Sequence, residues 1–156
     1  MRRGLAWLGM AVILLVLNGI AIHRERLIAN GRPVLLKLAP ADPRSLMQGD
    51  YMRLGYSFGE MPDPPAPKGQ AVMRLDGRGV ATFARYDADA GAPLAAGEVA
   101  MQYTRIDWRT RIAPDAWYFQ EGQAEHFSAA RYARVIVTSD GVVSLVGLLD
   151  ENLRDL

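Results

Sequence analysis

The stretch Tyr51–Phe58, which reads YMRLGYSF, decides how this chain is expected to fold. Its larger apolar residues recur at every second position, at Met52, Leu54, Tyr56 and Phe58. Successive side chains of a β-strand point to opposite faces of the sheet. The spacing therefore predicts a half-buried strand whose apolar face meets a core, while Tyr51, Arg53, Gly55 and Ser57 face away from it.

Several other short runs show the features of strands, namely apolar or alternating residues between turn residues. They are Pro33–Ala39, Ala71–Leu75, Val80–Tyr86, Glu98–Asp107, Arg134–Thr138 and Val142–Leu149. Asp76–Gly79 and Ser139–Gly141 each separate two of these runs and predict two hairpins. Trp108–Ile112 is interpreted as an extension of the preceding strand.

One segment has a different period. Ala124, Phe127, Ala130 and Arg131 fall at helical spacing, and neither Gly nor Pro interrupts residues 123–133. This pattern predicts one short helix. The expected fold is mostly β (β-rich α+β), a small antiparallel β-sheet or half-barrel domain with one short helix.

The N-terminal part of the chain has the composition of a membrane segment. Gly4–Ile22 carries no charge, and 19 helical residues span about 28 Å, close to the hydrocarbon thickness of a bilayer. We therefore predict a transmembrane anchor over residues 1–23 and a β-rich extracytoplasmic domain over residues 24–156. The apolar run Leu5–Leu17 also fits a signal peptide cleaved after Ala21, and this alternative stays open.

Orientation is not decided by charge alone, because Arg2 and Arg3 precede the apolar segment whereas Arg24, Arg26 and Arg32 follow it. A basic start followed by a hydrophobic run is typical of export signals. We therefore place the C-terminal domain in the periplasm of a bacterium, attached to the inner membrane by a single pass.

Composition excludes several classes of site and partner. The net charge of +1 gives no indication of nucleic-acid binding. The chain has no Cys and two His, which excludes thiolate chemistry and argues against a multi-histidine metal site. We expect no cofactor and no metal.

The segment Gly49–Tyr56, GDYMRLGY, fits the pattern Gly-Asp-Tyr-x-x-Leu-x-Tyr and resembles the signature of the GDYXXLXY family. Asp42–Gln48 is similar to the family's lead-in, and Tyr118–Gly122 with Ala130–Tyr132 is similar to its second block. The resemblance implies an uncharacterised, membrane-associated bacterial protein. It also implies association with a multispanning membrane protein, and it implies no particular reaction.

The motif has a structural interpretation and a functional one. In the structural one, Gly49 permits a turn, Asp50 accepts backbone hydrogen bonds, and Leu54 and Tyr56 enter the core, while Tyr51 lies on the other face of the strand. In the functional one, Arg44, Asp50, Tyr51 and Glu121 form a polar binding site at one end of the sheet. Arg44, Asp50 and Glu121 are then expected to converge.

Tests for known catalytic patterns give little support for an enzyme. Ser45–Asp50 resembles part of a signal peptidase I box, but this register places Ala41 at the nucleophile position and leaves only Lys68 as a base. His126 is expected at the surface. The four aromatic residues of the C-terminal half are expected in core or interface packing more than in a ligand patch; these are Trp108, Trp117, Tyr118 and Phe119.

Two hypotheses of function follow. The leading one is a non-catalytic, membrane-anchored periplasmic protein, an accessory or binding subunit of an envelope membrane-protein complex. The alternative is a small periplasmic enzyme or ligand-binding domain that uses Arg44, Asp50, Tyr51 and Glu121. The sequence leaves the oligomeric state undetermined.

Overall fold

The computed structural model describes residues 10, 12–20, 30–39, 51–87 and 92–156. The chain divides into two compact units, Met1–Gly31 and Arg32–Leu156. In the first unit, residues 12–20 are helical. Within the described residues, no helix has both the length and the apolarity that crossing a membrane requires. The predicted anchor over residues 1–23 lies partly outside the described residues and stays a prediction.

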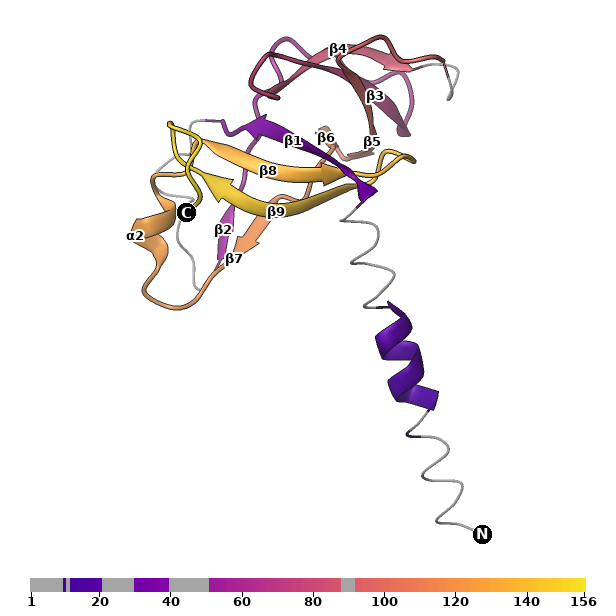
Figure 1. Cartoon of the computed structure of the whole chain (residues 1–156). Helices are drawn as coiled ribbons and strands as arrows, with labels where there is room; N and C mark the ends of the chain where they lie inside the picture. The colour runs from indigo at the N-terminus through magenta and orange to yellow at the C-terminus, as the bar shows by residue number, and fades with distance from the viewer. Residues whose placement is uncertain (1–9, 11, 21–29, 40–50, 88–91) are drawn as a thin grey trace. The chain divides into compact units, whose positions relative to one another are not determined.

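The second unit is β-rich, and its antiparallel strands form a curled half-barrel, as the alternating patterns predicted (Figure 1). The strands form three sheets, in the orders β1-β8-β9, β4-β3-β5-β6 and β2-β7. The bounds are β1 Arg32–Lys37, β2 Tyr51–Arg53, β3 Lys68–Leu75, β4 Ala81–Asp87, β5 Glu98–Ile106, β6 Arg109–Arg111, β7 Ala116–Tyr118, β8 Tyr132–Val137 and β9 Val143–Leu149. A single described helix in this unit, α2, spans Ala124–Phe127.

The three-stranded sheet places β8 between β1 and β9. In its register Val34 lies opposite Val135, and Leu36 lies opposite Ala133. All four side chains are almost fully buried. The predicted strand at Pro33–Ala39 and the predicted C-terminal hairpin are therefore confirmed, because the alternating residues do face a common core.

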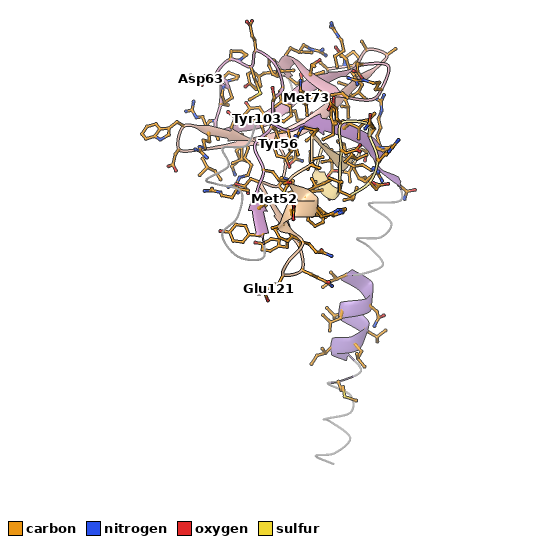
Figure 2. All side chains as sticks on the ribbon, turned by 90° about the vertical axis from the view of Figure 1, so that its left-hand side faces the viewer. Met52, Tyr56, Asp63, Met73, Tyr103 and Glu121 are labelled. Atoms are coloured by element: carbon orange, nitrogen blue, oxygen red, sulfur yellow. The ribbon has the colours of Figure 1, made fainter. Side chains whose placement is uncertain are left out.

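The four-stranded sheet is built around β3, which pairs with β4 on one side and β5 on the other. A register shift between Val72 and Met73 interrupts the β3–β4 ladder. Such a bulge increases the local twist and helps a sheet to curl. Met73 and Tyr103 of this sheet and Met52 of β2 lie along the interior of the unit (Figure 2).

Backbone hydrogen bonds join the sheets across the half-barrel, including three that pair a strand with a turn or an extended segment. The Leu35 amide donates to the Gly79 carbonyl at 2.9 Å, and the Phe83 amide donates to the Phe58 carbonyl at 2.8 Å. The Gln102 amide donates to the Gly141 carbonyl at 2.8 Å. Because each bond pairs a strand edge with a turn or an extended segment, the edges are partly covered.

The predicted helix is much shorter than the pattern suggested. Only Ala124–Phe127 is helical, and β8 begins at Tyr132. The Arg131 amide already donates to the Leu149 carbonyl at 2.8 Å, so the chain has joined the sheet by that point. Burial of Tyr132 and Ala133 between two neighbouring strands outweighs the helix preference of the alanine-rich sequence.

The prediction that Trp108–Ile112 extends the preceding strand is wrong. β6 folds back on β5, with Ile106 opposite Arg109 and Thr104 opposite Arg111. The chain reverses at Asp107, whose φ of 55° lies in the left-handed region. Aspartate tolerates this conformation better than most residues, which allows the tight turn.

Candidate functional site

The motif segment changes its pairing partner along its length. β2 pairs with β7, and beyond Arg53 the Leu54 amide donates to the Asp115 carbonyl at 2.8 Å. The Gly55 carbonyl then accepts from the Ala39 amide, and the Ser57 amide donates to the Lys37 carbonyl, each at 2.9 Å. The predicted eight-residue strand is thus a three-residue strand followed by an extended segment that links two sheets.

The predicted facing of this segment is confirmed. Met52, Leu54 and Phe58 are 4%, 8% and 8% exposed, and Tyr56 is half-buried. The alternate positions Tyr51, Arg53, Gly55 and Ser57 are exposed. Alternation survives the change of partner because the backbone stays extended throughout.

Tyr56 ties the motif segment to the loop before β7. Its hydroxyl donates to the carbonyl of Pro114, 58 residues further along the chain. Burial, and then the negative charge of Asp115, raise the pKa of the Tyr56 hydroxyl well above its usual value. The group therefore stays protonated and acts as a hydrogen-bond donor rather than as a base.

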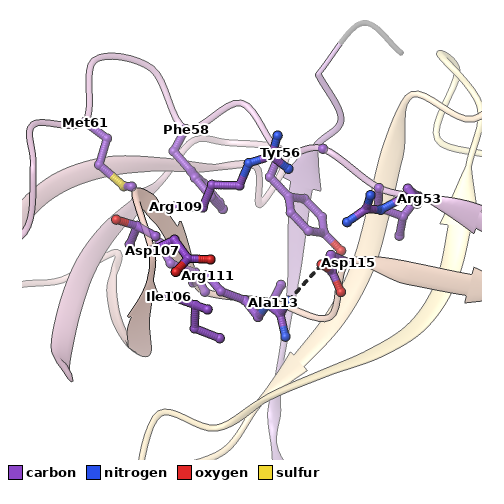
Figure 3. A pocket seen from close by; sticks show the side chains of 14 residues that line it. Arg53, Tyr56, Phe58, Met61, Ile106, Asp107, Arg109, Arg111, Ala113 and Asp115 are labelled. Carbon is purple, nitrogen blue, oxygen red and sulfur yellow. Dashed lines mark hydrogen bonds and ion pairs between the residues drawn. The ribbon is translucent and has the colours of Figure 1, made fainter. Parts of the chain in front are cut away.

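Beside Tyr56 lies a groove with a volume of about 830 Å³ (Figure 3). One wall is the motif segment with Met61, and the other is the β5–β6 hairpin with the loop after it. Arg53 lies at one end in the view and Met61 at the other, with Tyr56 and Arg109 between them. The lining residues are Arg53, Leu54, Gly55, Tyr56, Phe58, Met61, Ile106, Asp107, Arg109, Thr110, Arg111, Ile112, Ala113 and Asp115.

Charged groups border this partly apolar groove. Arg53, Arg109 and Arg111 contribute three cations, against the carboxylates of Asp107 and Asp115. Arg111 binds Asp115, with 3.1 Å between Nη2 and Oδ2. Within the described part of the chain, no ion pair engages Arg53 or Arg109. A guanidinium group suits carboxylates and phosphates, which it can bind through two parallel hydrogen bonds.

The groove combines positive charge with an apolar floor, which suits the binding of an anionic group. Its lining includes no serine, lysine or histidine, and its charged side chains are those of arginine and aspartate. Across the described residues, no group of three or more His, Asp or Glu side chains is placed to hold a metal ion. Arginines over an apolar floor can instead hold an anionic group with an apolar body.

The four predicted site residues are only partly accounted for. Tyr51 is 37% exposed and lies across the β2–β7 ribbon from Tyr118, with 5.7 Å between the ring centroids. Glu121 is exposed in the turn between β7 and α2, beyond Met52 in Figure 2. Arg44 and Asp50 lie outside the described residues, as does Gly49. The expected convergence of Arg44, Asp50 and Glu121 stays a prediction.

Sequence reasoning missed most of the groove. The alternation predicted that Arg53 faces solvent, and Trp108–Ile112 was interpreted as part of a longer strand. Arg109 and Arg111 were therefore not predicted as site residues. One feature of the sequence could have indicated the hairpin. Asp107 interrupts the alternating run that starts at Glu98, and aspartate favours turns. Asp115 lines the groove because its backbone carbonyl accepts a hydrogen bond from the Leu54 amide of the distant motif segment. No local pattern in the sequence indicates this contact.

The four aromatic residues of the C-terminal half do not form one patch. Trp117 and Phe119 pack against Phe127, with ring centroids 6.1 and 5.2 Å apart. Tyr118, between them, is 74% exposed, and Trp108 is 92% exposed in the β5–β6 turn. Trp117 and Phe119 thus pack inside the domain as expected, whereas Tyr118 and Trp108 are exposed, and for these two the expected interface packing stays a prediction. His126 is exposed on α2, as predicted.

A sequence model of the GDYXXLXY protein family matches residues 13–148, which is most of the chain. The chain belongs to the GDYXXLXY family. Of the family signature, Leu54 and Tyr56 line the groove, and Tyr51 begins the ribbon next to it. No curated protein and no solved structure matches the chain.

Proposed function

We propose that this GDYXXLXY protein is a non-catalytic accessory or binding subunit of an envelope membrane-protein complex. In this proposal residues 1–23 anchor it in the bacterial inner membrane by a single pass, with the C-terminal domain in the periplasm. The groove beside Tyr56 receives a segment of a multispanning membrane protein. No nucleic acid takes part.

One observation carries the proposal, namely the combination of arginines and apolar floor in the groove. Arg53, Arg109 and Arg111 border a surface formed in part by Leu54 and Phe58. Such a surface favours a partner segment that presents a carboxylate beside apolar side chains. The uncharged run Gly4–Ile22 supports the membrane location.

The alternative of a small periplasmic enzyme or ligand-binding domain uses Arg44, Asp50, Tyr51 and Glu121. Only Tyr51 and Glu121 of these four residues are described, and both are exposed. No described geometry at these two positions favours catalysis. The groove therefore carries the proposal.

Chemical crosslinking in intact cells tests the proposed role. The full chain would be crosslinked, extracted with detergent and purified, and its partners would be identified by mass spectrometry. We expect a multispanning membrane protein to be enriched with the wild-type chain. Arg109→Glu should greatly reduce this enrichment because it reverses a charge at the centre of the groove.

Lys68→Glu is the matched control, since it reverses an exposed charge on β3 that does not line the groove. It should leave the enrichment unchanged. Equal enrichment with both variants would show that the groove does not hold the partner. No enriched membrane protein with the wild-type chain would overturn the proposal of a binding subunit.

A further inference from the structure

The tip of the β5–β6 hairpin exposes an unusual amount of apolar surface. Trp108 is 92% exposed and Ile106 is 47% exposed. Tryptophan side chains are normally highly buried on average, because their large apolar area is costly to hydrate. A tryptophan that projects almost completely from a tight turn therefore suggests that another surface covers it in the cell.

Positive charge gathers immediately behind this tip. The hairpin residues 104–111 contain Arg105, Arg109 and Arg111 and the carboxylate of Asp107, and Arg111 is paired with Asp115 just after the hairpin. Residues 24–156 as a whole carry a net charge of −1, since the net charge of +1 includes Arg2 and Arg3. The hairpin thus concentrates positive charge in a domain that is otherwise nearly neutral.

This combination fits the surface of a lipid bilayer. Tryptophan prefers the boundary between head groups and acyl chains, where its ring is dehydrated and its N–H keeps a hydrogen-bond partner. Arginine beside it binds lipid phosphates through paired hydrogen bonds. A protein partner would need a preformed pocket for a projecting indole, whereas the bilayer interface adapts to it.

We propose that the tip of the β5–β6 hairpin docks on the membrane, with Trp108 in the interface and Arg105, which does not line the groove, on an anionic phospholipid head group. The inference rests on the anchor in the proposed function. Residues 24–31 would then tether the domain to the bilayer over at most about 29 Å. Such a tether gives a high effective concentration of lipid surface, so a small contact suffices.

Tryptophan fluorescence of the full chain tests this contact. The chain contains Trp7, Trp108 and Trp117, so replacing two at a time by Phe leaves a single reporter. Each variant would be reconstituted in bilayers of phosphatidylcholine and phosphatidylglycerol, with or without brominated acyl chains. We expect Trp108 emission to shift to the blue, to be quenched by brominated lipid and to be protected from aqueous acrylamide.

Trp7 reports on the anchor and Tyr118→Trp provides the matched control. Trp7 lies in the apolar segment and should be quenched by brominated lipid if the anchor is embedded. Tyr118 is 74% exposed outside the hairpin, so a tryptophan placed there in a background lacking the other three should be quenched by acrylamide only. Arg105→Gln should weaken Trp108 docking about fivefold, the usual effect of one cation near an anionic surface.

The outcomes separate the two proposals. Trp7 quenched by lipid with Trp108 quenched by acrylamide would leave the anchor intact and overturn the docking of the tip. Absence of lipid quenching at Trp7 would overturn the anchor and, with it, the tether. Trp108 shielded from both quenchers would indicate a protein contact and contradict docking on lipid, as would equal lipid quenching at position 118.

Discussion

Leu54 is a buried residue of the motif segment, and its side chain tests which face of that segment meets the core. Its side chain is 8% exposed in the common core, whereas the neighbouring Arg53 is exposed at the end of the groove. Truncation of a buried leucine removes its transfer free energy and leaves a cavity. A change at an exposed position usually alters stability little.

We predict that Leu54→Ala lowers the free energy of unfolding by about 2–5 kcal/mol and that Arg53→Ala changes it by less than about 0.5 kcal/mol. Thermal unfolding of the full chain, followed by circular dichroism of its β-structure, measures both. Equal melting temperatures for the two variants would show that the facing assignment is wrong.

Gly141 is the glycine whose conformation holds the β8–β9 turn against β5. Its φ is +86°, and an added Cβ would lie 3.2 Å from the Ala100 carbonyl oxygen. An L-residue in the left-handed region costs about 1–2 kcal/mol. We therefore predict that Gly141→Ala lowers the free energy of unfolding by at least about this amount.

Gly77 supplies the control for this substitution. It also lies in a hairpin turn, but an added Cβ would meet no atom within 4 Å, and its φ is not positive. Gly77→Ala should therefore be nearly neutral in the same unfolding experiment. A neutral Gly141→Ala would indicate that the turn can detach from β5 without cost.

At the scale of elements, a partly buried ion pair joins β4 to the start of β5. Nη1 of Arg85 lies 2.7 Å from Oε1 of Glu98, whose side chain is 6% exposed. The Ala95 amide donates to Oε2 of the same carboxylate at 3.0 Å. The Arg85 guanidinium, and then this amide, hold the pKa of Glu98 below its usual value of 4.5.

The sign of the resulting pH dependence follows from this lowered pKa. The unfolded chain takes up the Glu98 proton more readily than the folded one, so stability falls as the pH drops. The contribution is fully present above pH 4.5 and is lost as the pH falls through the pKa of the folded state. Glu98→Gln should lower the melting temperature at neutral pH and flatten its decline below about pH 4.5.

Melting curves of both chains between neutral and acid pH measure this difference. The other carboxylates are common to the two proteins, so their contributions cancel in the comparison. Parallel declines in melting temperature would contradict a stabilising role for the ionised Glu98.

At the scale of the whole molecule, the attachment of the apolar segment decides where the domain works. We predict that residues 1–23 stay attached, because Gly4–Ile22 is long enough to span the hydrocarbon core. Intact-mass analysis of the protein extracted from membranes measures this directly. A mature chain that begins near Ile22 would establish cleavage of a signal peptide instead.

Orientation needs a separate measurement, since the charges on the two sides of the apolar segment do not determine it. Alkaline phosphatase fused after Leu156 is expected to be active, because the C-terminal domain is predicted to lie in the periplasm. An inactive fusion that is present at normal levels would place the domain in the cytoplasm.

Local patterns in the sequence determined which residues face the core and where two hairpins turn. The alternation from Met52 to Phe58 and the turn residues around Gly77 and Gly141 act over a few positions, so no distant contact is needed to interpret them. The family signature, too, is a local pattern. For this reason the amino-acid sequence alone predicts these features.

The candidate groove forms only through contacts between segments that are distant in the sequence. It exists because Tyr56 meets Pro114 across 58 residues of sequence, and because Asp107 reverses the chain so that β6 lies along β5. A different long-range pairing, that of β8 with β1 and β9, ended α2 early, since burial of β8 between these two strands outweighs local helix preference. Contacts between distant segments depend on the packing of the whole domain, which no local pattern specifies.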